Sequence, residues 1–315
     1  MPPDADHHYK AVALGAAGIA VLCVMDGVIK HLVATNDALV VTLGRYVFGA
    51  FFALVIWMRS GRPAITRDMW KAHALRGVVI AMAATSFFWC LSVLPLAELI
   101  VITFVAPLIV PFVARVIIGE KVRARSIAAG LAGFAGVIVA STGGDNFAAD
   151  NQRMLGIAAA VFSAVAYAVS ITLLRGRAGK DGAPVIGILS TVIPGAIIAI
   201  PTLLTGELPP ASDLPDFLAL GAIAAAGMYL LARAYAGAEA QVLAPLEFTA
   251  LVWATLVGFL FFGEVPRPQV FIGGVVIVAA CLWGAQKEKR KLMTPFAPAT
   301  PPAAALADGE SARPS

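Results

Sequence analysis

The chain has 315 residues, of which 60% are hydrophobic and only 13% are charged, and its mean hydropathy is +0.86. A soluble domain carries roughly 25% charged residues, so this composition excludes an ordinary water-soluble protein and indicates a chain that folds in lipid. The net charge of +4 is small. The three cysteines lie inside apolar segments, without the spacing of a disulfide framework or a zinc site, so we predict neither a metal nor a cofactor.

Ten apolar segments are long enough to cross a bilayer as helices, which takes about 20 residues each. In chain order the expected spans are 11–33, 38–58, 75–93, 98–118, 126–143, 154–174, 184–204, 215–235, 241–262 and 269–286. The connections are too short to hold a soluble domain. The first span contains charged residues and no small-residue cleavage site, so we predict that it is retained rather than removed as a signal peptide.

The basic residues between these spans predict an orientation. If the N-terminus lies in the cytoplasm, sixteen Lys and Arg residues fall on the inner side, Arg76 among them. The outer loops then receive only Arg153 and Arg267. This asymmetry predicts a multi-pass protein of the inner (plasma) membrane with both termini in the cytoplasm. It also supports the number of spans, because one missed helix would exchange the sides of every later loop.

Two stretches, Leu94–Glu120 and Ala238–Glu264, resemble each other at a constant offset, and both end in Gly-Glu. Each half of the chain has five spans, an odd number, so the halves enter the membrane from opposite sides and form an inverted repeat. We therefore predict an all-α integral membrane fold of ten transmembrane helices in two inverted five-helix repeats. The expected parts are a cytoplasmic N-terminus (1–10), a first repeat (11–143), an outer linker (144–153), a second repeat (154–286) and a disordered, Ala/Pro-rich cytoplasmic tail (287–315).

These features together resemble the EamA-type drug/metabolite transporter superfamily. The segments Met25–Leu32, Gly44-Arg45-Tyr46 and Leu243–Pro266 are similar to a subgroup that includes riboflavin and S-adenosylmethionine carriers. The resemblance implies a central cavity lined by spans one to four and six to nine, with spans five and ten at the periphery. One departure is that the fourth span has two prolines, whereas the ninth has a single proline near its start.

Charged residues at membrane depth are candidates for function, because each costs about 2.5–3.5 kcal/mol on insertion scales. Asp26 and Lys30 are four residues apart, so they share a helix face and can neutralise each other. They form either a gate or substrate contact, or a pair that fixes the first helix. Glu120 and Glu264 follow glycine at helix ends, and we interpret them as terminal structure rather than as ligands.

Arg45 lies about two turns into the second span. Its guanidinium has the geometry to hold a carboxylate or a phosphate of a substrate. The alternative is a structural ion pair with Glu98, at the outer start of the fourth span, or with Asp26.

Glu247 is the most specific candidate, because it follows Pro245 by two residues and proline loosens a helix. Its carboxylate could bind a cationic or hydrogen-bonding substrate or carry a coupling proton. The alternative is a salt bridge to Arg233 in the eighth span. If the substrate contains a ring, Trp89 and Tyr229 are the aromatic residues that we expect to contact it.

We predict a secondary-active or facilitative transporter that moves a small polar metabolite by alternating access, with riboflavin or another flavin, or an S-adenosylmethionine-like compound, as the favoured substrate. Export of amino acids, amino-acid-derived metabolites or drugs is the alternative. A membrane-embedded lipid-modifying enzyme is disfavoured, because the acids within the spans do not cluster as Mg²⁺ ligands do. The expected partners are the substrate, membrane lipid and a coupling proton or sodium ion, but no nucleic acid. The glycine stripe of the fifth span, Gly130, Gly133 and Gly136, indicates close packing within the protomer or in a homodimer.

Overall fold

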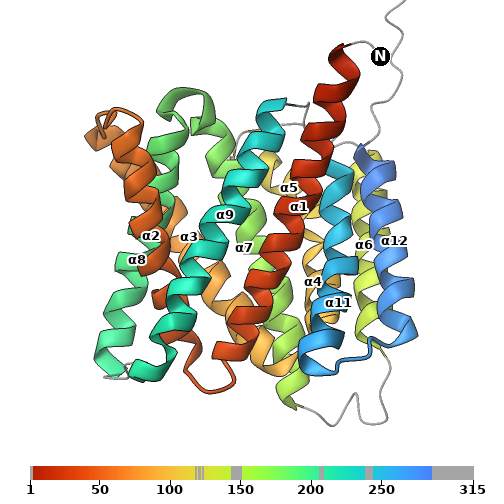
Figure 1. Cartoon of the computed structure of the whole chain (residues 1–315). Helices are drawn as coiled ribbons and strands as arrows, with labels where there is room; N and C mark the ends of the chain where they lie inside the picture. The colour runs from red at the N-terminus through yellow and green to blue at the C-terminus, as the bar shows by residue number, and fades with distance from the viewer. Residues whose placement is uncertain are drawn as a thin grey trace, which may run out of the picture. The chain divides into compact units, whose positions relative to one another are not determined.

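The structure is a computed structural model that describes residues 3–117, 119, 122, 124–142, 151–205, 209–237 and 244–285 (Figure 1). Residues 1–284 form one compact unit, which holds the transmembrane helices. The tail expected at 287–315, nearly all of the linker expected at 144–153, and Glu120 lie outside the described residues.

The described part of the chain is helical and contains no β-strand. Among the described residues, eight helices are long and apolar enough to cross a membrane, and two shorter apolar helices, Leu246–Phe262 and Pro268–Trp283, bring the number to ten. The chain is therefore an all-α integral membrane protein of two inverted five-helix repeats. In order, its elements are α1 (Pro3–Leu32), α2 (Ala38–Arg59), α3 (Arg67–Val93), α4 (Leu96–Thr103), α5 (Ala106–Ile117), α6 (Ala124–Ser141), α7 (Asn151–Asp181), α8 (Ala183–Thr205), η1 (Ala211–Asp213), α9 (Leu214–Gly237), η2 (Ala244–Thr249), α11 (Ala250–Phe262) and α12 (Pro268–Ala285).

The fourth span is broken in the middle into α4 and α5. Pro107 cannot donate a hydrogen bond to the carbonyl of Thr103, and its ring does not fit inside a continuous helix, so the chain turns at Phe104-Val105. Proline is tolerated in the first turn of the new helix, where its missing N–H would have no partner. The ninth span is also irregular, since it begins as the 3₁₀ helix η2 before α11. Each repeat therefore has an interrupted helix at the corresponding position.

Several helices begin earlier than their apolar segments indicate, and for α3 and α7 this changes where an arginine lies. We expected the third span to start at 75, but α3 starts at Arg67, where the Thr66 hydroxyl accepts a hydrogen bond from the Met69 N–H at 3.3 Å. Arg76, assigned by sequence to an inner loop, is therefore inside a helix and buried. Arg153, assigned to an outer loop, lies in the first turn of α7 and is also buried. Both assignments were wrong. At α3 the Thr66 cap, rather than hydropathy, sets where the helix starts.

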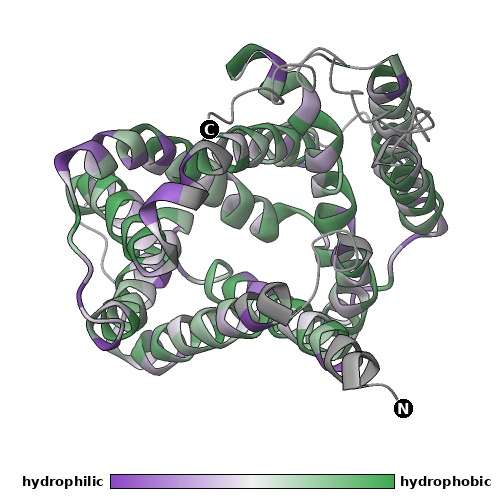
Figure 2. Ribbon diagram, turned by 90° about the horizontal axis from the view of Figure 1, so that it is seen from above, coloured by the Kyte–Doolittle hydropathy of each residue, from purple (hydrophilic) through white to green (hydrophobic). Residues whose placement is uncertain are grey.

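Helices of the first repeat pack against helices of the second repeat. α1 lies beside α9, α2 beside α8 and α9, and α3 beside α7 and α8. Seen from above in Figure 2, hydrophobic residues occupy most of these helices. Because successive spans alternate in direction, the pairs α1–α9, α2–α8 and α3–α7 are antiparallel, whereas α2–α9 and α3–α8 run parallel.

The glycine stripe of α6 packs within the protomer. A Cβ at Gly130 would lie 3.2 Å from the Phe112 ring, and one at Gly136 would lie 3.0 Å from the carbonyl of Gly273 in α12. A Cβ at Gly133 would overlap Leu108. Figure 1 shows α6 and α12 side by side at one edge of the bundle. The stripe therefore serves close contact between α5, α6 and α12.

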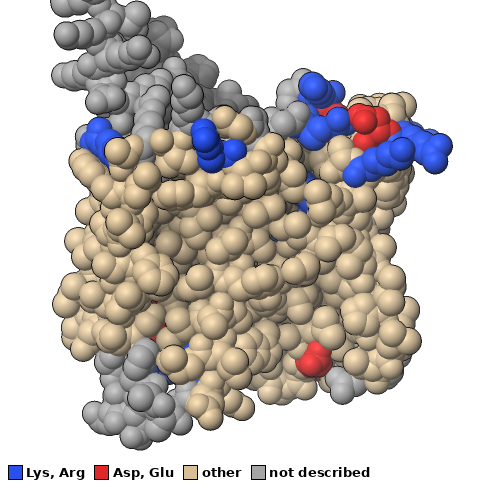
Figure 3. All heavy atoms as spheres, turned by 180° about the vertical axis from the view of Figure 1, so that it is seen from behind, with Lys and Arg blue, Asp and Glu red and all other residues tan. Residues whose placement is uncertain are grey.

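The two ends of the bundle differ in charge. Lys and Arg side chains gather at the end where α1 begins, as Figure 3 shows. We call this end the basic face; its exposed residues include Arg59, Arg62, Arg67, Lys71 and Lys180. The other end, where α1 and α3 finish, is the opposite face. The main apolar core includes Ile29, Leu94 and Leu96, which are fully buried near the opposite face.

Candidate functional site

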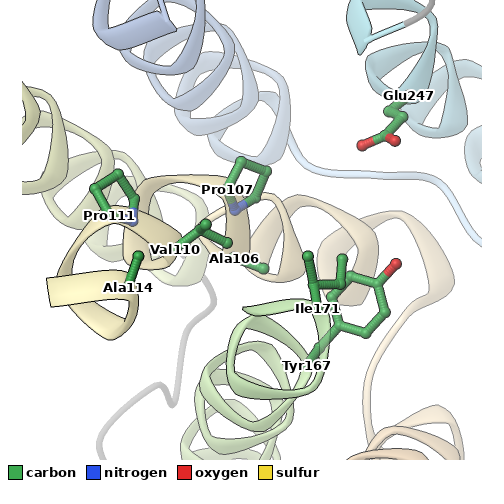
Figure 4. A pocket seen from close by; sticks show the side chains of 8 residues that line it. All are labelled: Ala106, Pro107, Val110, Pro111, Ala114, Tyr167, Ile171 and Glu247. Atoms are coloured by element: carbon green, nitrogen blue, oxygen red, sulfur yellow. The ribbon is translucent and has the colours of Figure 1, made fainter. Parts of the chain in front are cut away.

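A cavity of about 410 Å³ lies between α5, α7 and η2. This volume is within the range of sites that hold small molecules. It is on the half of the bundle nearer the basic face, because η2 begins its span there and α5 ends its span there. Figure 4 shows the residues that line it: Ala106, Pro107, Val110, Pro111, Ala114, Tyr167, Ile171 and Glu247.

The cavity is apolar except for two side chains on separate walls. In Figure 4 the Glu247 carboxylate and the Tyr167 hydroxyl are directed toward the space between η2 and α7. Tyr167 is 51% exposed although it belongs to the middle of a membrane-spanning helix, because it faces this cavity. A few polar groups in an apolar wall are typical of a site that orients a small ligand.

The broken helix adds a backbone acceptor to this wall. Pro107 lines the cavity, and because residue 111 is proline, the carbonyl of Pro107 has no helical N–H to accept from. Non-helical backbone is tolerated at membrane depth where it lines a cavity. Carboxylate, phenol and carbonyl oxygens together favour a ligand that donates hydrogen bonds or carries positive charge.

Asp26 and Arg45 do not line this cavity. Asp26 is buried in α1, with 9% of its surface exposed. Within the described part of the chain its carboxylate makes no hydrogen bond or ion pair, although the charge of Arg45 in α2 acts on it. The Arg45 guanidinium stacks 4.9 Å from the centre of the adjacent Tyr46 ring. Of the two acidic partners that we considered for Arg45, the nearby one is therefore Asp26.

Lys30 forms its ion pair with Glu264, not with Asp26. Lys30 Nζ lies 2.8 Å from Glu264 Oε1 and donates to the carbonyls of Leu91 and Leu94 at 3.0 and 2.7 Å. The expectation that Asp26 and Lys30 neutralise each other was wrong, because the Glu264 carboxylate and two carbonyls of the turn between α3 and α4 together take all three donors of Lys30. Glu264 is more than a terminal residue, since it holds α11 to α1 and α4.

Glu98 pairs with Arg153 rather than with Arg45. The Glu98 side chain is 2% exposed and accepts a hydrogen bond of 2.6 Å from Arg153 Nη2. Arg153 also donates to the carbonyl of Ser141, at the end of α6. This pair therefore joins α4, α6 and α7 and has a structural role.

The remaining predicted site residues lie away from the cavity. Tyr229 is 54% exposed on α9, and its hydroxyl accepts a hydrogen bond from Arg233 of the same helix at 2.9 Å. Trp89 is half-buried and packs against the main core. Of the residues predicted from the sequence to form the site, only Glu247 lines the cavity.

A polar network joins α3 and α7 at the basic face. Asp181 accepts hydrogen bonds from Arg177 at 2.9 Å and lies 3.0 Å from His73 Nε2, while Arg177 also contacts Asp68. Burial alone would raise the pKa of Asp181, but the hydrogen bonds from Arg177 and His73 outweigh it and hold that pKa below its usual value. Among the described residues, no cluster of three or more His, Cys, Asp or Glu could hold a metal ion.

The model of the EamA-like transporter family matches residues 10–142 and again residues 154–284. The two matches cover both repeats and most of the chain. The chain belongs to the EamA-like transporter family. It is therefore a membrane transporter.

Several relatives of this EamA-like chain have named substrates. A riboflavin transporter of Rhizobium johnstonii is 28% identical over 256 residues, which is 80% of this chain and 82% of the relative. The pseudopaline exporter CntI of Pseudomonas aeruginosa is 24% identical, over 87% of this chain and 95% of the relative. An S-adenosylmethionine uptake transporter of Rickettsia bellii is 23% identical, over 85% and 90%.

The fold of this EamA-like chain has a solved counterpart. A crystal structure that is 18% identical in sequence superimposes with a TM-score of 0.59 and covers 87% of this chain and 97% of its own. At this identity the likeness supports the fold alone.

Sequence reasoning missed two residues of the EamA-like bundle. Tyr167 was one of several aromatic residues in the spans, and only the structure shows that it lines the cavity. Arg76 is 8% exposed in α3, and its Nη1 donates to Ser190 Oγ of α8 at 2.6 Å. The sequence did contain a signal for Arg76, since Thr66 followed by Asp68 is typical of a helix start.

Proposed function

We propose that this transporter moves a small polar metabolite across the inner membrane by alternating access, as a secondary-active or facilitative carrier. The observation that carries the proposal is the cavity beside the α4–α5 break, with Glu247 and Tyr167 in its walls. Broken helices of inverted repeats are where secondary transporters bind substrate. The positive-inside rule assigns the basic face to the cytoplasm, so both termini are cytoplasmic and this cavity belongs to a state open inward.

The favoured substrate is a flavin or an S-adenosylmethionine-like compound. Tyr167 offers a ring face for stacking, and Glu247 offers an acceptor for N–H groups or a partner for a positive charge. The riboflavin and S-adenosylmethionine relatives support this choice. The pseudopaline exporter favours a second candidate, export of an amino-acid-derived metabolite, which the same carboxylate would also suit.

The broken helices supply the moving parts of the proposed mechanism. The helix is interrupted between α4 and α5, and its type changes from 3₁₀ to α between η2 and α11, so each half-helix can shift without unfolding its partner. Substrate bound between Glu247 and Tyr167 contacts both repeats through η2 and α7. A proton or sodium ion at the Glu247 carboxylate would couple this movement to a gradient.

The test is uptake into proteoliposomes of labelled riboflavin, S-adenosylmethionine and a panel of amino acids, with and without an imposed pH gradient. Glu247→Gln keeps the size of the side chain and removes its charge. We expect it to lower transport at least about tenfold, since hydrogen bonds to a charged group contribute about 1.5–3 kcal/mol. Asp216→Asn, at an exposed residue in the first turn of α9, is the control and should transport at the parent rate. Parent-rate transport by Glu247→Gln would remove Glu247 from the mechanism.

A further inference from the structure

The turn between α3 and α4 leaves two backbone groups without helical partners. In a continuous helix the carbonyl of Leu91 would accept from residue 95, but residue 95 is proline and has no N–H. The N–H of Leu96, the first residue of α4, has no preceding turn to donate to. The end of α3 therefore presents carbonyls, and the start of α4 presents an N–H, within one short turn of the opposite face.

Side chains from two distant helices satisfy these groups. Lys30 of α1 donates to the carbonyls of Leu91 and Leu94 at 3.0 and 2.7 Å, and Glu264 Oε2 accepts from the Leu96 N–H at 2.8 Å. The ion pair of 2.8 Å between Lys30 and Glu264 Oε1 completes the arrangement. All three donors of the Lys30 ammonium are used, and each oxygen of Glu264 has a partner.

The signs of these charges match the helix ends that they contact. The C-terminal end of a helix carries partial negative charge and the N-terminal end carries partial positive charge. The Lys30 ammonium contacts the C-terminal end of α3, and the Glu264 carboxylate contacts the N-terminal end of α4. Exchanging the two side chains would place a carboxylate against carbonyls and an ammonium against an N–H.

The end of α11 is shaped to deliver the Glu264 carboxylate to this turn. Gly263 adopts a left-handed conformation with φ of +64°, which ends the helix and turns the chain back. The Glu264 N–H then donates to the carbonyl of Gly258 at 3.0 Å, and a Cβ at Gly258 would lie 2.9 Å from Glu264 Oε2. The Glu264 side chain therefore lies directly over a position where only glycine leaves it room.

We propose that Lys30 and Glu264 form the gate that closes the cavity from the opposite face, and that this gate works in one charge order only, because the ends of α3 and α4 are part of it. The proposal rests on alternating access as the function. The contacts join α1 and α4 of the first repeat to α11 of the second, so the two repeats cannot separate at this face until these contacts break.

The test measures access to the cavity and requires no transported substrate. The three native cysteines, all buried, are replaced by alanine, and Ile171→Cys supplies a reporter at a partly exposed position of the cavity wall. A charged, membrane-impermeant methanethiosulfonate reagent is applied to right-side-out or inside-out vesicles. We expect labelling from the basic face in the parent, with labelling from the opposite face at least about tenfold slower. Lys30→Ala should raise the rate from the opposite face on the order of tenfold, because it shifts the population toward the state open there.

Two further variants separate this gate from an ordinary ion pair. Glu264→Gln keeps an acceptor for the Leu96 N–H but loses the charge, so it should open the opposite face less than Lys30→Ala does. The double variant Lys30→Glu/Glu264→Lys restores an ion pair in the reverse order, and we expect the opposite face to stay open. His31→Ala, at the exposed neighbour of Lys30, is the control and should label like the parent.

Each result decides one part of the proposal. Parent-like labelling from the opposite face in both Lys30→Ala and Glu264→Gln would overturn the gate. Parent-like labelling in the charge-reversed double variant would overturn the role of the helix ends. Gel filtration and thermal unfolding of each variant show whether its bundle is intact. Because labelling does not depend on transport, failure to find a substrate would count against the proposed function and leave the gate result unaffected.

Discussion

Removing Arg153 should be among the most destabilising single substitutions in this protein. Arg153→Ala leaves the Glu98 carboxylate, which is 2% exposed, without the guanidinium that now lies 2.6 Å away. It also removes the hydrogen bond from Arg153 to the carbonyl of Ser141. Taking away one partner of a buried ion pair costs about 3–5 kcal/mol, because the remaining charge stays buried without compensation.

This magnitude corresponds to a large change in melting temperature. At about 2–4 °C per kcal/mol for a domain of this size class, we expect Arg153→Ala to lower Tm by about 6–20 °C. The double variant Glu98→Met/Arg153→Met should recover most of the loss, since an apolar pair of similar volume carries no buried charge. The assay is thermal unfolding of purified variants in one detergent.

Asp68→Ala is a matched control, because Asp68 also accepts from an arginine at 2.6 Å, but its side chain is 75% exposed. An exposed ion pair contributes about 0–1 kcal/mol, so Tm should fall by no more than about 4 °C. Equal losses for Arg153→Ala and Asp68→Ala would refute the argument that burial sets the cost. A double variant no more stable than Arg153→Ala would refute it as well.

Two further predictions concern packing and acidity. Gly273→Ala should destabilise the protein by about 1–3 kcal/mol, because its Cβ would lie 2.5 Å from the carbonyl of Gly136 where α6 contacts α12. Gly187→Ala is the control: a Cβ there would have no atom within 4 Å, so the variant should be neutral or up to about 1 kcal/mol more stable. Equal unfolding curves for the two variants would contradict this. The pKa of Asp181 is lower folded than unfolded, so its contribution to stability is complete above the unfolded value of about 3.9 and is lost as pH falls through the folded value. Asp181→Asn should therefore unfold with a weaker pH dependence below about pH 4, and an unchanged acid slope would show that the network with His73 does not hold in solution.

Much of the fold could be predicted from the sequence, because hydropathy and charge asymmetry are properties of each segment by itself. Ten apolar segments and an odd number per half are enough to predict inverted repeats, whichever side chains touch. The errors were at helix starts. Arg76 and Arg153 are polar, so they were assigned to loops, whereas α3 and α7 extend beyond the apolar segments and the tertiary structure supplies partners for both residues.

The residues of the candidate site were harder to predict from the sequence. Glu247 could be selected because a carboxylate close to a proline at membrane depth is unusual, and the structure does place it in a cavity wall. Tyr167 could not be selected, because nothing local distinguishes an aromatic residue that faces a cavity from one that faces lipid. Trp89 and Tyr229 illustrate this, since one packs on the core and the other is exposed on α9.

The sequence by itself determined that this protein folds in lipid, that it is helical and that its two repeats are inverted, because these properties follow from the composition of each segment. Only the tertiary structure decided which charges meet. Spacing along one helix favoured Asp26 as the partner of Lys30, but the turn made by Pro95 brings two carbonyls and Glu264 to the same ammonium. Three acceptors together bind the Lys30 ammonium in preference to the Asp26 carboxylate one helical turn away. Which acceptors surround Lys30 depends on where the ends of α3 and α11 lie in the folded protein.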